Sequence, residues 1–175
     1  MRILVTGGSA SGKSEFAEQK LLKLAGGGQK YYIATMPIFS REDELRKEKH
    51  LRARQGRGFV TIEQPDGLST LRLPDAPPGS GRYALLEDIG TLAANEMFGE
   101  KGASGALARS VEGALSIAAQ CDGVVIVSVD VARDGGGYGA ETGEYIRTVE
   151  RINSALASAF DEVYEVAAGI AVKIK

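Results

Sequence analysis

The residues best suited to chemistry in this sequence form a glycine-rich segment near its start. The segment reads Gly7, Gly8, Ser9, Ala10, Ser11, Gly12, Lys13 and Ser14, which matches the pattern G-x-x-x-x-G-K-[ST] in full. In such a loop, backbone N–H groups and a helix N-terminus surround a phosphate, while the lysine reaches the β and γ oxygens. The serine hydroxyl can ligate Mg²⁺. The segment predicts a phosphate-binding loop, and the alternative is a glycine-rich turn that binds nothing.

A magnesium ion held by a nucleotide also needs an acidic residue near the loop. Glu87 closes the apolar run YALLE, so we expect it at the end of a buried strand. Asp88 could take its place, and Asp130, which follows GVVIVSV, is the second candidate. The carboxyl ends of parallel strands gather at one edge of a sheet, which favours these acids over the alternative of solvated loop residues. Ser14 and Glu87 are therefore the predicted metal ligands.

His50 is the only histidine of the chain, and it lies in the charged segment REDELRKEKHLRAR. On a helix, Arg46, Arg54 and Arg57 would approach it at i−4, i+4 and i+7. Cationic neighbours favour the neutral imidazole, which is the nucleophilic form, and the same arginines would hold arriving phosphates. Composition alone also allows a plain surface histidine. The pattern leaves both interpretations open.

These residues need a framework that brings strand ends together. Apolar β-branched runs alternate with longer charged or amphipathic segments, as in a mostly parallel sheet. We expect strands over 2–6, 30–34, 59–63, 83–87, 123–129, 162–166 and 170–174, and helices over 13–25, 42–54, 91–98, 106–120 and 141–159. A glycine-rich mobile loop is expected over 133–139. The predicted fold class is α/β, a P-loop NTPase-like three-layer sandwich with a mostly parallel central sheet flanked by helices.

The composition is that of one globular domain spanning residues 1–175. Charged residues make up 25% and hydrophobic residues 43%, and the formal net charge is -2. This balance supplies no basic field for nucleic acid, so any polyanion that the protein binds must be held locally. Cys121 is the single cysteine, so an internal disulfide is excluded. No segment has the length of a membrane span or a secretory signal, and we expect a cytoplasmic protein.

Several separated blocks of the sequence resemble the adenosylcobinamide kinase/adenosylcobinamide-phosphate guanylyltransferase family of cobalamin biosynthesis. The blocks read ILVTGGSASGKSEFAE, YYIAT, KHLRARQGRGFVTIEQP, LLEDIGTLAANEMF and YIRTVERINSALASAFDEVYEVAAGIAVKIK, and they cover nearly the whole chain. A generic phosphate-binding loop shares only the first block, so the resemblance is more specific than the loop motif.

The resemblance implies two reactions at one nucleotide site. ATP or GTP would phosphorylate the hydroxyl of adenosylcobinamide, and GMP would then pass from GTP to adenosylcobinamide phosphate. The histidine that carries GMP in the family corresponds to His50, with Lys13 as the second catalytic residue. The resemblance also implies a homo-oligomer, suggested to be a trimer, and the loop over 133–139 could cover the bulky corrinoid.

The nucleotide contacts of the family would fall on four parts of this sequence. They are Gly7 to Ser14 in the loop, then Ala34, Thr35 and Met36, then Leu51, Arg52, Ala53 and Arg54, and finally Glu63 and Glu87.

The chain departs from the family's usual pattern in two places. Ala10 stands where the family often has arginine, and Val129-Asp130 stands where it often has Asn-Glu. These differences affect the expected polar contacts near the acceptor and the efficiency of the kinase step. Two alternatives therefore remain: a P-loop kinase of another small alcohol, with His50 as a bystander, and a non-catalytic nucleotide-binding module.

Overall fold

The computed structural model of this protein describes residues 1–37, 41, 56–131 and 139–175. The helix predicted over 42–54 lies outside the described residues, and so does the predicted loop over 133–139 apart from Gly139.

Strands and helices alternate in the described part of the chain, as the sequence predicts. The strands are β1 (Arg2–Gly7), β2 (Gln29–Ala34), β3 (Phe59–Glu63), β4 (Arg82–Glu87), β5 (Gly123–Val127), β6 (Glu162–Ala167) and β7 (Ile170–Lys173). The helices are α1 (Lys13–Ala25), α3 (Ile89–Phe98), α4 (Ala106–Ala119) and α5 (Ala140–Ala159), with a short 3-10 helix, η1 (Leu68–Thr70). The start of α3 is two residues earlier than predicted because the Asp88 side chain caps the helix by accepting from the Thr91 N–H.

The described strands form one seven-stranded sheet in the order β3-β2-β4-β5-β1-β6-β7. Every neighbouring pair is parallel except β6 and β7, which are antiparallel. The strand order and the antiparallel end could not be read from the sequence. Parallel pairing brings the carboxyl ends of six strands to one edge, which is where the candidate site residues are expected.

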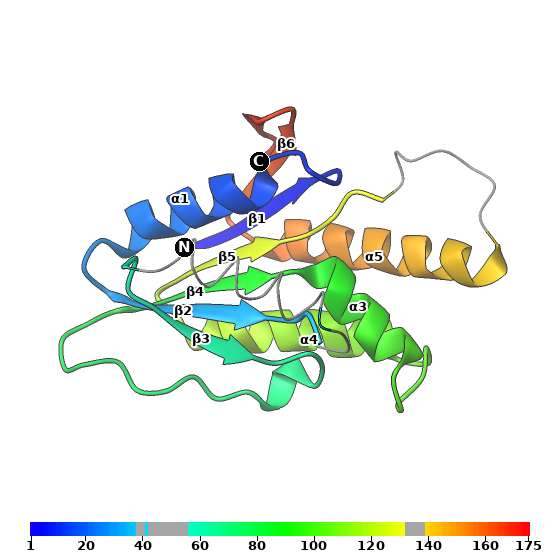
Figure 1. Cartoon of the computed structure of the whole chain (residues 1–175), viewed down its shortest axis with the longest axis horizontal. Helices are drawn as coiled ribbons and strands as arrows, with labels where there is room; N and C mark the ends of the chain where they lie inside the picture. The colour runs from blue at the N-terminus through cyan, green and yellow to red at the C-terminus, as the bar shows by residue number, and fades with distance from the viewer. Residues whose placement is uncertain (38–40, 42–55, 132–138) are drawn as a thin grey trace.

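The sheet is covered on both faces, which makes the three-layer sandwich that the sequence predicts (Figure 1). Helix α1 packs on one face, where Ala17 and Leu21 contact the side chains of β1, β4 and β5. Helices α3, α4 and α5 cover the other face, and α5 contributes a buried stripe of Val149, Ile152 and Leu156. The buried sheet between these layers holds the strand ends in fixed positions.

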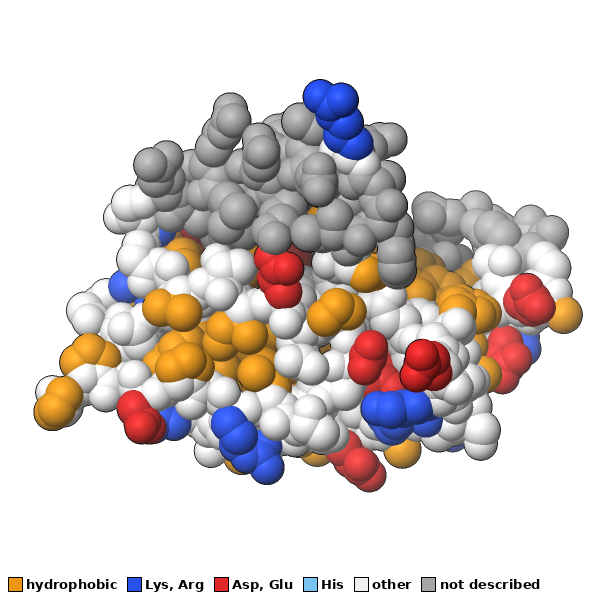
Figure 2. All heavy atoms as spheres, turned by 60° about the horizontal axis from the view of Figure 1, so that its bottom comes forward, with side chains coloured by type: hydrophobic (Ala, Val, Ile, Leu, Met, Phe, Trp, Pro, Cys, Tyr) orange, Lys and Arg blue, Asp and Glu red, His pale blue; other side chains and the backbone are white. Residues whose placement is uncertain are grey.

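The distribution of charged side chains on the surface is consistent with the small net charge of -2. On the face shown in Figure 2, acidic and basic side chains of the described residues lie close to one another and form no large basic area. None of the helices within the described ranges combines the length and the apolar character that crossing a membrane requires.

Candidate functional site

The predicted phosphate-binding loop connects β1 to α1 and has the backbone that the motif requires. Gly12 precedes the helix with φ of 91°, in the left-handed region that favours glycine. Lys13 is the first helical residue, and its Nζ donates to the Gly8 carbonyl oxygen at 3.1 Å, across the mouth of the loop. Ala10 also lies in the left-handed region, with φ of 52°. The loop therefore curves back on itself and keeps its lysine at the opening.

Gly7 allows the loop to lie close to the end of β6. A Cβ atom at this position would meet the Val166 carbonyl oxygen, and it would lie 2.7 Å from the Ser11 hydroxyl. Ser11 itself is buried, and its hydroxyl has no hydrogen-bond partner among the described residues. Any larger residue at position 7 would thus push the loop away from the sheet.

The turn between β6 and β7 supports the loop from behind, a contact that the sequence did not predict. The Gly169 N–H donates to the Ser11 carbonyl oxygen at 2.8 Å. A Cβ atom on Gly12 would stand 3.3 Å from the Gly169 Cα, so the two backbones are nearly in contact. A short hairpin could be suspected from the sequence around Gly169, but nothing there indicates its partner.

The two predicted metal ligands lie side by side. The Ser14 hydroxyl donates to the Glu87 carboxylate, which joins the start of α1 to the end of β4. Carboxylate and hydroxyl oxygens are ligands that suit Mg²⁺, with the remaining positions left to phosphate oxygens and water. Among the described residues there is no group of three or more His, Cys, Asp or Glu side chains that could hold a metal without a nucleotide.

The residues expected at the ends of β2, β3 and β4 form one row across the sheet. Ala34 is paired with Glu63 on one side and with Glu87 on the other. Thr35 is fully buried behind this row, whereas Met36 is half-buried and Glu63 is exposed. The structure thus brings these five predicted contact positions to the same edge as the loop.

Thr35 fixes the backbone that carries Glu87. Its hydroxyl lies 3.0 Å from the Glu87 carbonyl oxygen and 2.9 Å from that of Asp88, and it accepts from the Asp88 N–H at 2.8 Å. The Thr35 N–H also donates to the Glu87 carbonyl oxygen at 3.0 Å. The nucleotide contact that the family resemblance implies for Thr35 stays a prediction, and in the structure its side chain positions the strand-end acid.

The other acids named from the sequence lie nearby. Asp88 serves as the cap of α3, because its Oδ1 accepts from the Thr91 N–H at 2.7 Å. The Asp130 N–H donates to the Gly7 carbonyl oxygen at 3.0 Å, which places this residue beside the start of the loop. Burial raises the pKa of Tyr145, and the charge of Asp88 raises it further.

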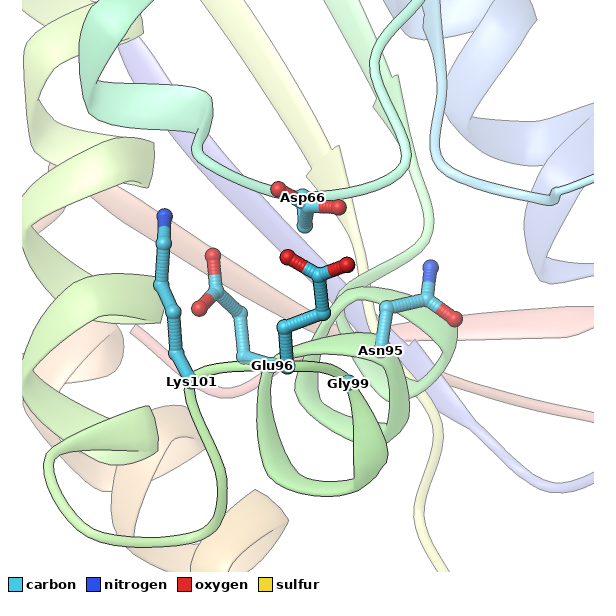
Figure 3. A pocket seen from close by; sticks show the side chains of 6 residues that line it. Asp66, Asn95, Glu96, Gly99 and Lys101 are labelled. Atoms are coloured by element: carbon cyan, nitrogen blue, oxygen red, sulfur yellow. The ribbon is translucent and has the colours of Figure 1, made fainter.

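A hollow of about 260 Å³ lies beyond this row, between α3 and the chain that follows β3. Figure 3 shows Asp66 facing the α3 residues across it. Its lining is mostly charged and consists of Asp66, Asn95, Glu96, Gly99, Glu100 and Lys101. None of the site residues predicted from the sequence lines it.

Two of the hollow's residues hold the local structure together. Asn95 Nδ2 donates to the carbonyl oxygens of Thr35 and Pro65, at 2.8 Å each. Glu96 is buried and accepts from Arg109 Nε at 2.5 Å and from the Gly67 N–H at 2.8 Å. These contacts connect α3 and α4 to the end of β2, and the sequence does not predict them.

Part of the predicted site lies outside the described residues. This is the case for the predicted nucleophile His50 and for Leu51, Arg52, Ala53 and Arg54. Arg57, which was predicted to approach His50, lies in a bend before β3, and its guanidinium contacts the Glu18 carboxylate at 2.5 Å.

Taken together, the sheet, the loop and the paired Ser14 and Glu87 define the class of P-loop NTPases. The solved structure of the flagellar accessory protein FlaH from Methanocaldococcus jannaschii has the same fold, with a TM-score of 0.54 at 12% identity. The match covers 99% of this chain and 77% of that chain. The predicted fold class is therefore confirmed.

The family is defined by the sequence. Residues 3–174 match the CobU family, described as cobinamide kinase / cobinamide phosphate guanyltransferase, and the chain belongs to this family. It is 32% identical to the bifunctional adenosylcobalamin biosynthesis protein CobU of Escherichia coli strain K12. It is 35% identical to the protein of the same name from Salmonella typhimurium strain LT2, and both matches cover 100% of each chain. The resemblance seen in the sequence is thus confirmed.

Proposed function

We propose that this chain phosphorylates adenosylcobinamide with ATP or GTP and then transfers GMP from GTP to the resulting phosphate, giving adenosylcobinamide-GDP. The family description names both activities, and the match extends over nearly the whole chain. The observation that carries the proposal is the contact between Ser14 and Glu87 at the mouth of the loop. That contact joins the loop motif to a strand-end acid, as a phosphate-transfer site requires.

The loop from Gly7 to Ser14 would hold the triphosphate. Its backbone N–H groups and Lys13 would stabilise the charge that spreads over the transferred phosphoryl group, which is the main protein contribution to such reactions. Ala34, Thr35, Met36 and Glu63 would line the nucleotide on the row of strand ends.

Ser14 and Glu87 would hold Mg²⁺, because they place a hydroxyl and a carboxylate within contact of each other. When bound, the ion would offset the negative charge of the phosphate groups. The chain's own contribution is to keep both oxygens in place, and Thr35 does so for Glu87 through the backbone.

His50 would take up GMP in the second reaction, with Leu51, Arg52, Ala53 and Arg54 near the nucleotide. The proposal rests on family membership and on the sequence, since His50 is the only histidine of the chain. The imidazole would attack the α-phosphorus of GTP and release pyrophosphate, and the acceptor phosphate would then displace the imidazole. A phosphoramidate conserves enough free energy for this second transfer.

The decisive experiment uses GTP labelled at the α-phosphate, Mg²⁺ and adenosylcobinamide, with mass analysis of protein and corrinoid. We expect an acid-labile, base-stable label on the protein, which His50→Ala abolishes, together with adenosylcobinamide-GDP as the product. Phosphorylated corrinoid without protein label would instead indicate a simple P-loop kinase. GTP binding without any turnover would indicate a non-catalytic module.

We also propose a homo-oligomer, specifically a trimer, and a cytoplasmic location, as the family resemblance implies. Sedimentation analysis of the purified chain tests the first of these. A monomer at all concentrations, with full activity, would contradict it.

A further inference from the structure

Asp130 lies at the carboxyl edge of the sheet, between the two strands that frame the nucleotide site. β5 is hydrogen-bonded to β4 on one side and to β1 on the other. After β5 ends, the chain continues along β1: the Ser128 N–H donates to the Val5 carbonyl oxygen at 2.9 Å, and the Asp130 N–H donates to that of Gly7 at 3.0 Å. Asp130 therefore stands beside the first residue of the loop, and it is only partly buried.

The backbone leading to Asp130 is also held from the helix side. The Ser128 hydroxyl donates to Asn153 Oδ1 at 2.6 Å, and Asn153 Nδ2 donates to the Val129 carbonyl oxygen at 3.1 Å. Both contacts come from the middle of α5. The position of Asp130 relative to the loop is thus set by β1 and α5 together.

Three of the acids at this edge have different surroundings. Glu87 contacts Ser14, so it belongs with the predicted metal ligands, and Asp88 caps α3. Asp130 is the acid whose backbone is bonded to the loop itself, one strand away from Glu87. An acceptor approaching the terminal phosphate over the end of β5 would meet this residue.

We propose that the Asp130 carboxylate orients the acceptor hydroxyl and takes its proton in the kinase step, a role that rests on the proposed function. The hydroxyl oxygen forms a bond to the γ-phosphorus while its proton passes to the carboxylate. The bond between the γ-phosphorus and the β,γ-bridging oxygen breaks, and the nucleoside diphosphate leaves. The proton then passes to water, which restores the carboxylate.

The second reaction does not need this residue. Its two nucleophiles are the neutral imidazole of His50, which attacks with a nitrogen lone pair, and then a phosphate group, which is already an anion. Neither has a proton that must be removed before it attacks. One enzyme therefore contains both the test reaction and its internal control.

The test compares Asp130→Asn with the unchanged enzyme in two separate assays. One assay follows phosphorylation of adenosylcobinamide, and the other follows GMP transfer to supplied adenosylcobinamide phosphate. Asparagine keeps the shape of the side chain but cannot take a proton. We expect kcat of phosphorylation to fall by at least about 100-fold and GMP transfer to stay within about threefold. Asp130→Ser should show the same selective loss.

Asp75→Asn is the matched control, because Asp75 is exposed and pairs with Arg82 at the opposite end of β4. It should leave both activities unchanged. Equal activities of Asp130→Asn and the unchanged enzyme would overturn the inference, and so would an equal loss in both assays. If the unchanged enzyme phosphorylates no corrinoid at all, the proposed function fails instead, so the two failures are distinguishable.

Discussion

Two regions border the candidate site, and they are held in place by different kinds of contact. The loop region consists of residues 7–14 with the β6–β7 turn, and its contacts are mainly between backbone atoms: Gly169 N–H to the Ser11 carbonyl oxygen, and Gly7 against Val166. The α3 region consists of Thr35, Asn95, Glu96 and Arg109 with residues 65–67, and there side chains make the contacts.

The kind of contact determines which substitutions destabilise each region. A region held by close backbone approach is sensitive to added atoms, because no side chain can move aside to make room. A region held by buried polar side chains is sensitive to removed atoms, because the remaining partner is left without a hydrogen bond. Substitutions that add or remove atoms in the two regions therefore test the comparison directly.

The largest effect is expected from Glu96→Ala in the α3 region. Only 1% of the Glu96 side chain is exposed, and it is paired with Arg109, of which 25% is exposed. Removing one partner of such a pair leaves an uncompensated charge, so the free energy of unfolding should fall by about 3–5 kcal/mol. Urea unfolding measures this loss in the free energy of unfolding. The control is Glu100→Ala, since Glu100 is an exposed neighbour on the same hollow. Equal stability of the two variants would show that the side-chain contacts do not hold this region.

Gly7→Ala is the corresponding change in the loop region. The added methyl group would meet the Val166 carbonyl oxygen, which belongs to a strand and cannot move away. We expect a loss of about 3 kcal/mol in the free energy of unfolding, at the upper end for overpacking, and weaker GTP binding by calorimetry. Gly8→Ala is the matched control for stability, because a Cβ there would have nothing within 4 Å. If both variants lost the same stability, close approach at Gly7 would not be the cause.

The comparison also explains how far the sequence could predict the site. The loop was predictable because Gly7, Gly12, Lys13 and Ser14 belong to one short motif, and each performs its task through local backbone geometry. Glu87 was predictable because an apolar strand ends at it. The layers and nearly all described elements followed from hydrophobic periodicity in the same way.

The α3 region was not predictable, since its partners are distant in the sequence. Glu96 and Arg109 lie on different helices, and the carbonyl oxygens that accept from Asn95 belong to Thr35 and Pro65. No periodicity links such positions, and a buried glutamate looks like a surface residue in a single sequence. The contact of Gly169 with the loop was missed for a similar reason: a backbone N–H leaves no signature in the sequence.

A smaller effect is expected from Thr35→Val, where the two regions meet. Valine has the same shape but leaves the Asp88 N–H without its acceptor, so stability should fall by roughly 2 kcal/mol. Because Thr35 positions the backbone of Glu87, kcat of phosphorylation should fall as well. Thr35→Ser keeps the hydroxyl and should restore most of kcat, which steady-state assays would show. No difference between the valine and serine variants would mean that the hydroxyl has no positioning role.

The smallest effect, and the only stabilising one, is expected from Ala168→Asn in the turn behind the loop. Ala168 and Gly169 form a two-residue turn with φ of 49° and 77°, which strains alanine but suits an Asn-Gly pair. Asparagine tolerates this conformation, so the free energy of unfolding should rise by about 0.5–1 kcal/mol and the Tm by ~2–3 °C. Thermal unfolding measures the change, with Ala168→Val as the opposite control because a β-branched residue disfavours positive φ. The turn bonds to Ser11 through its backbone, so GTP affinity should not fall in the asparagine variant. If the asparagine variant were more stable but bound GTP more weakly, GTP binding would depend on the strained backbone of Ala168. The hydrogen bond from Gly169 to Ser11 would then not be sufficient.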